Sequence, residues 1–157
     1  MAVTAGQKLR TSDLNLGANV VQTLGGQFRS STSGGVTTVE STVLTTPTVN
    51  LLANTTYLIE YCLYWTTTVT GDIIVLHIRD TNSTGTSRAA TVPFAAISGG
   101  GGPYPGYATA LLQTSTAAAY NAVGTVMRNT GSGTVTALAN SSLVISQLGP
   151  NANFTTV

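Results

Sequence analysis

Tyr57-Leu-Ile-Glu-Tyr-Cys-Leu-Tyr-Trp65 is the stretch that decides the fold of this chain. Its odd positions, from Tyr57 to Trp65, are all apolar, whereas the even positions include Glu60 and Cys62. Apolar residues at every second position are typical of a β-strand with one buried face. This stretch therefore predicts a strand at the centre of a sheet.

The next stretch, residues 73–79, alternates in the same way, with Ile74, Leu76 and Ile78 on one face and His77 on the other. Thr70-Gly71-Asp72 separates it from the first stretch. Glycine and aspartate favour tight turns. The two strands are therefore expected to form a hairpin.

The composition of the whole chain agrees with a β fold. Only 7% of the 157 residues are charged, against about 25% in an average soluble domain. Thr and Ser make up roughly a quarter of the chain, and Thr favours the surface of a strand. We predict one all-β domain, a jelly-roll β-sandwich of short strands. Further strands are expected at about residues 36–44, 89–97, 107–113, 119–128, 134–138 and 142–148, with a hairpin turn at 129–133.

Charge and residue counts argue against several classes of function. The formal net charge is +1, which leaves no basic footprint for nucleic acid. No stretch is long and apolar enough to span a membrane, and no targeting segment is visible. One Cys and one His make neither an internal disulfide nor a zinc site. No metal, cofactor, nucleic acid or membrane is therefore expected, and the free Cys62 favours synthesis in a reducing cytoplasm.

An enzyme is not expected. His77 is the sole candidate for a general base, and Cys62 is the sole thiol nucleophile. Both fall inside predicted strands, whereas catalytic groups gather on loops. A catalytic Cys–His pair and a structural role for both residues are the two alternatives, and their positions inside strands favour the structural role.

Residues 1–28 read as an N-terminal arm before a β-domain at 29–149 and a tail at 150–157. Thr11-Ser12-Asp13 is a plausible start for a short helix, which Gly17 limits to a turn or two. The arm holds too many apolar residues to stand alone in water. The candidates for attachment to a partner are Leu9, Leu14, Leu16, Val20 and Val21.

A second candidate contact surface is the Gly/Pro-rich stretch of residues 98–106. It reads as an exposed loop that makes Tyr104 and Tyr107 available for contacts. Packing against another subunit and stacking against a sugar are both open readings of these two tyrosines.

Several short motifs resemble virion proteins of tailed phages. The opening Thr4-Ala-Gly-Gln-Lys-Leu-Arg-Thr-Ser-Asp-Leu-Asn15 resembles the start of many such proteins. Four later motifs, in this order, resemble a β-domain of actinobacterial phage proteins that serve in the capsid surface or minor tail: Leu52-Ala-Asn-Thr-Thr-Tyr57, His77-Ile-Arg-Asp-Thr81, Arg128-Asn-Thr-Gly-Ser-Gly-Thr134 and Gln147-Leu-Gly-Pro150.

The resemblance implies a jelly roll of the tumour-necrosis-factor type that forms a homotrimer, and it implies no catalytic residues. The expected function is a trimeric capsid decoration protein, made in the host cytoplasm and located in the virion. Its partners would be other copies of itself and the major capsid protein or another virion protein. The alternative is a minor tail or fibre protein that binds a host receptor or surface glycan in the manner of a lectin.

Overall fold

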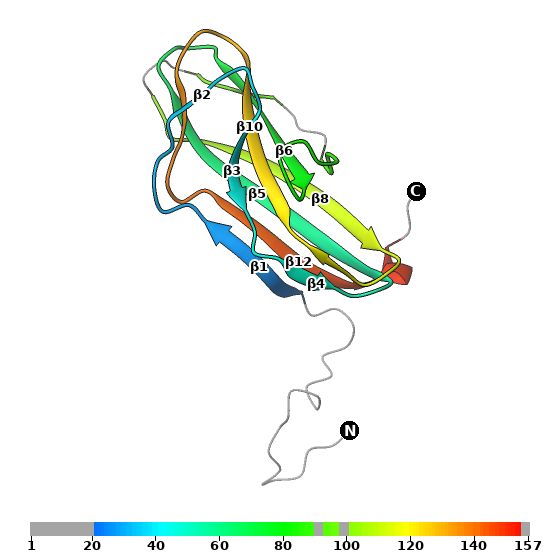
Figure 1. Cartoon of the computed structure of the whole chain (residues 1–157). Helices are drawn as coiled ribbons and strands as arrows, with labels where there is room; N and C mark the ends of the chain where they lie inside the picture. Colours follow the sequence, from blue (N-terminus) through cyan, green and yellow to red (C-terminus); the bar gives the residue numbers. More distant parts are fainter. Residues whose placement is uncertain (1–20, 90–92, 98–100, 155–157) are drawn as a thin grey trace.

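The computed structural model describes residues 21–89, 93–97 and 101–154, and these residues form an all-β sandwich (Figure 1). A single 3₁₀ turn, η1, follows the last described strand, and no described helix is long and apolar enough to cross a membrane. The elements are β1 (Gln22–Phe28), β2 (Gly35–Val36), β3 (Ser41–Thr45), β4 (Val49–Leu51), β5 (Thr55–Thr67), β6 (Ile73–Asp80), β7 (Phe94–Ala95), β8 (Tyr104–Thr114), β9 (Ala118–Tyr120), β10 (Ala122–Thr130), β11 (Val135–Ala137), β12 (Ser142–Pro150) and η1 (Asn151–Asn153).

The described strands form two main antiparallel sheets. The larger sheet has β1, β12, β5 and β8 side by side in that order. β11 pairs with the last residues of β5, from Trp65 to Thr67, and β2 pairs with β11. The smaller has the order β3-β10-β6-β7, and β4 pairs with β9 separately. β5 is the longest strand and has a partner on each side, as the alternation of residues 57–65 predicted.

The core lies between the two sheets. The odd-numbered side chains of β5 from Tyr57 to Trp65 are at most 1% exposed. They meet Ile74, Leu76 and Ile78 of β6, which are 0% exposed. Both alternating faces predicted from the sequence are therefore the buried faces, and the predicted all-β sandwich is confirmed.

The two predicted hairpins are wrong. β5 belongs to the larger sheet and β6 to the smaller one, so the turn between them carries the chain across the sandwich. The turn at residues 129–133 does the same between β10 and β11. Each strand finds its partners through long-range pairs, which a local turn motif does not reveal.

Asp72 joins these two crossings. Its buried carboxylate accepts hydrogen bonds from the Thr67 hydroxyl and from the Gly133 backbone N–H. Burial alone would raise the pKa of Asp72, but these hydrogen bonds and the nearby Arg128 outweigh it and lower the pKa. A charged carboxylate thus holds both crossings together at one end of the sandwich.

The end of the predicted arm belongs to the larger sheet. β1 pairs with β12 from Gln22↔Gln147 to Phe28↔Ser142, so residues 22–28 are an edge strand of the domain. The described β-domain therefore includes residues 22–28, which the sequence had assigned to the arm. The predicted short helix lies outside the described residues. At the other end, the tail begins within the fold, because Asn151 donates to the Thr114 carbonyl and accepts from the Thr56 hydroxyl.

Candidate subunit interface

The outer face of the larger sheet follows from the alternation of its strands. Since the odd positions of β5 point into the core, its even positions, with Glu60 and Cys62 among them, point outward. The pairing register then sets their neighbours in β1, β12 and β8. Three outward rows cross these strands: Phe28–Ser142–Cys62–Tyr107, Gly26–Val144–Glu60–Thr109 and Thr23–Ser146–Leu58–Leu111.

Large apolar side chains stand at the two edges of this face. Phe28 of β1 is 72% exposed, and Val21, directly before β1, is 59% exposed. At the opposite edge, Tyr107 and Leu111 of β8 are 56% and 61% exposed. Exposed apolar surface on one face can mark an interaction site. The other exposed large apolar side chains of the described residues, Val39, Leu52, Val69 and Ile97, lie outside the strands of this face.

The same face carries little charge. Among the described residues, Glu60 is the carboxylate with neither a hydrogen bond nor an ion pair. Glu40 and Asp80 are paired with Arg79 and Arg88, and both of these pairs involve β6 of the other sheet. A partner that covers the outer face of the larger sheet would therefore desolvate few charges.

A shallow hollow of about 220 Å³ lies in the middle of the outer face. Its rim includes Glu60, Cys62 and Tyr107. Burial raises the pKa of the Cys62 thiol, while hydrogen bonds with Tyr107 and Tyr64 act in the opposite direction without restoring it. A thiol with a raised pKa stays protonated at neutral pH and is a poor nucleophile.

The predicted contact loop is partly wrong. Tyr104 and Tyr107 both lie in β8, because its backbone pairs with β5 from Trp65↔Tyr104 onward. The ring of Tyr104 packs against Trp65, with centroids 5.2 Å apart and an angle of 49° between the planes. Tyr104 therefore supports the core, whereas Tyr107 stays exposed. A contact role for Tyr107 remains a prediction.

The predicted attachment residues Leu9, Leu14, Leu16 and Val20 lie outside the described residues. Val21 is described, and it is exposed beside β1. Sequence reasoning missed Phe28 and Leu111 as surface candidates. The sequence did contain a signal for Leu111. Ala108 and Ala110 face the core of the sandwich, so Leu111, which alternates with them along β8, faces outward.

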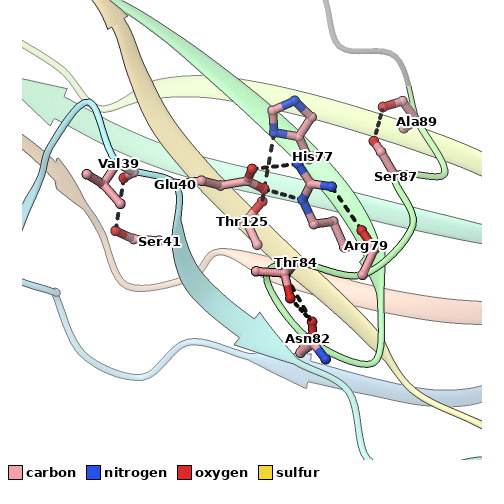
Figure 2. Close-up of polar contacts among 11 residues, drawn as sticks. Val39, Glu40, Ser41, His77, Arg79, Asn82, Thr84, Ser87, Ala89 and Thr125 are labelled. Atoms are coloured by element: carbon pink, nitrogen blue, oxygen red, sulfur yellow. Dashed lines mark hydrogen bonds and ion pairs between the residues drawn. The ribbon is translucent and has the colours of Figure 1, made fainter.

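Cys62 and His77 are not brought together. Cys62 faces outward from β5 of the larger sheet, and His77 faces outward from β6 of the smaller sheet, so the core separates them. His77 Nδ1 instead lies 3.3 Å from Oε1 of Glu40 (Figure 2). Within the described part of the chain, no group of three His, Cys, Asp or Glu side chains could hold a metal ion.

Glu40 is the centre of a polar cluster on the smaller sheet. Arg79 donates two hydrogen bonds to its carboxylate, and the Thr125 hydroxyl donates another (Figure 2). Burial alone would raise the pKa of Glu40, but these bonds and the charges of His77 and Arg79 lower it below 4.5. The cluster connects the segment before β3 to β6 and β10. No sequence motif predicted it.

A hollow of about 320 Å³ lies near the end of the smaller sheet. Arg88 Nε donates to both carboxylate oxygens of Asp80, and the Tyr120 hydroxyl donates to Oδ1 at 2.8 Å. Burial and the Asp80 carboxylate raise the pKa of the Tyr120 hydroxyl. The Asp80 carboxylate thus accepts hydrogen bonds from both Arg88 and Tyr120, and its bond with Tyr120 connects β6 to β9.

Comparison with known proteins gives no family. No protein-family model and no curated protein matches the chain. Among solved structures, infectious bursal disease virus of the Gt strain is 16% identical, with a TM-score of 0.47 over 85% of this chain and 35% of that chain. The VP2 subviral particle of the same virus is 15% identical, with a TM-score of 0.48 over 86% of this chain and 33% of that one.

A carbohydrate-binding module of Cellvibrio mixtus lichenase 5A, in complex with cellotriose, is also similar. It is 14% identical, with a TM-score of 0.32 over 82% of this chain and 96% of that chain. The chain spans about a third of the length of the virus proteins that it matches. All of these likenesses are too distant to indicate a function.

Proposed function

We propose that this chain is a non-enzymatic structural protein of a phage virion, and that it decorates the outer capsid surface as a homotrimer. One observation carries the trimer. Large exposed apolar side chains stand at opposite edges of one weakly charged sheet face, Phe28 on β1 and Leu111 on β8.

Two different edges suit a head-to-tail contact. In such a contact the β1 edge of one copy meets the β8 edge of the next, and the series closes into a ring when the rotation allows it. Burial of an exposed Leu or Phe side chain contributes about 1.5–3 kcal/mol. Three such contacts per ring would supply a useful part of the association energy.

The virion assignment is supported by the sequence motifs, from Thr4–Asn15 at the start to Gln147–Pro150 near the end. The capsid partner would be the major capsid protein or another virion protein. A non-enzymatic role is supported by the separation of Cys62 from His77 and by the raised pKa of the thiol. A minor tail or fibre protein that binds a host glycan is the alternative within the same class.

Light scattering on the purified full chain tests the oligomer. The full chain should give three times its mass of 16.0 kDa, and Leu111→Glu should give a single copy because it places a charge in the contact. Ile97→Glu is the matched control, since Ile97 is 86% exposed and lies beyond β7 of the other sheet. A monomeric full chain would overturn the trimer.

Capsids that lack the protein test the location. Purified protein should bind them in many copies spread over the shell, as seen by electron microscopy. A few copies confined to the tail would favour the tail protein. Failure to bind any part of the particle would overturn the virion assignment, whatever the oligomeric state.

A further inference from the structure

One edge of β8 has no strand partner among the described residues. It pairs with β5 over its full length, from Trp65↔Tyr104 to Thr55↔Thr114, without a register shift. No other described strand pairs with it, and it runs along one side of the sandwich (Figure 1). Alternate backbone N–H and C=O groups of β8 therefore point away from the sheet. A long, regular edge of this kind is a template for pairing with another strand.

The remaining edges of the two main sheets are blunted. β1 holds Gly25 and Gly26 and has a register shift between Thr23 and Gly25. β3 has five residues and faces a register shift in β10, and β2 and β7 have two residues each. β8 has no charged residue, and Pro105 is its one edge-protecting residue. β8 is thus the edge that most needs a partner.

Residues 14–20 have the pattern of a strand that fits this edge. Leu14, Leu16, Ala18 and Val20 alternate with Asn15, Gly17 and Asn19, and no residue between Leu14 and Val20 is charged. Period-two alternation is the pattern of a strand with one apolar face, so this interpretation replaces the short helix expected after Thr11-Ser12-Asp13. We propose that residues 14–20 of one copy pair with the free edge of β8 in a neighbouring copy, as an added strand.

The reach of the chain requires a neighbouring copy. Residue 20 is joined through Val21 to β1, which lies at the opposite edge of the sheet from β8. An added strand beyond β8 would be four strand spacings from β1, about 19 Å. One residue spans at most about 3.6 Å. Residues 14–20 therefore cannot pair with β8 of their own chain.

This pairing rests on the proposed trimer and gives it a structural basis. Each copy would donate its arm to the next and receive one from the previous copy, so the contact is head-to-tail. It brings Phe28 on the β1 side of one copy toward Leu111 on the β8 side of the next. The same residues were predicted from the sequence to contact the particle, and the experiment separates the two partners.

Hydrogen exchange of the full chain, read by NMR at the β8 amides, is the test. Alternate amides from Tyr107 to Gln113 should be protected although they face away from β5. Ala18→Pro removes a backbone donor within the proposed strand. It should speed exchange at those amides about tenfold or more and lower the mass toward one copy. Ala5→Pro, upstream in the arm, is the control and should change neither.

Each other outcome contradicts the pairing in its own way. If the full chain is a trimer but the outward β8 amides are unprotected, the trimer stands and the pairing is wrong. If Ala18→Pro leaves mass and protection unchanged and abolishes capsid binding, the arm contacts the particle instead. If protection persists in a full chain that is monomeric, both the trimer and the exchange of arms are wrong.

Discussion

Arg79 holds Glu40 with two hydrogen bonds, from Nε to Oε1 and from Nη2 to Oε2, each 2.6 Å long. This two-pronged geometry is the strongest form of an arginine–carboxylate contact. Both side chains are less than one-fifth exposed, at 19% and 18%. The pair fastens the segment before β3 to the outer face of β6, on the sheet opposite the candidate interface.

Glu40→Gln should lower the free energy of unfolding by about 1–3 kcal/mol, because it weakens both bonds and leaves the charge of Arg79 unpaired. Denaturant titration followed by circular dichroism measures this change. Glu60→Gln makes the same substitution at an exposed carboxylate without a described partner. It should not lower stability, and an equal loss in both variants would contradict the role given to Arg79.

The protein should lose stability in acid. Glu40 and Asp72 have lowered pKa values in the folded chain, so each contributes stability that is present above its ordinary value, 4.5 and 3.8 respectively. That contribution is lost as the pH falls through the lowered values. Thermal unfolding at a series of pH values should show this decline. Glu40→Gln should show a shallower decline than the unaltered chain, and parallel curves would contradict the assignment.

Two buried tyrosines of β5 should respond differently to removal of the hydroxyl group. The Tyr57 hydroxyl accepts a hydrogen bond of 2.6 Å from the Leu52 N–H, whereas the Tyr61 hydroxyl has no partner among the described residues. Tyr57→Phe should cost about 1–3 kcal/mol, and Tyr61→Phe should be neutral or stabilising. Chemical denaturation of both variants decides this, and the reverse order would be the contrary result.

The proposed trimer should resist salt. The outer face of the larger sheet carries Glu60 as its one described charged side chain, so screening removes little attraction. Light scattering should give the same mass at about 0.1 M and about 1 M NaCl. Dissociation at the higher concentration would show that ion pairs hold the copies together.

The sequence predicted which face of a strand is buried better than it predicted which strands pair with each other. The buried sides of residues 57–65 and 73–79 were correct, because alternation reports which side chains leave water. The hairpin between them was wrong, because β5 and β6 pair with distant strands in different sheets, and the buried Asp72 at the turn bonds to the distant Gly133. Likewise, β1 was not predicted as a strand. Its Gly25 and Gly26 do not favour a strand, and its pairing with β12 is a long-range contact.

The candidate interface was only partly predictable. Alternation in residues 107–113 indicated a strand, but the exposure of Leu111 depends on β8 having no neighbour beyond it. Tyr104 was misplaced because Gly and Pro residues resemble a loop, whereas Trp65 provides it with a packing surface. The Glu40 cluster joins three segments that are far apart in the sequence, and no local pattern reports such a contact.

β12 lies between β1 and β5 and pairs with both. On the ribosome, β1 and β5 therefore emerge before the strand that joins them. The larger sheet closes only after residues 142–150 have left the exit tunnel. Until then, the apolar odd face of β5 has β8 as its one long sheet partner. The sheet therefore cannot form before β12 is available, and until then the unpaired edges of β1 and β5 are surfaces that a chaperone could cover.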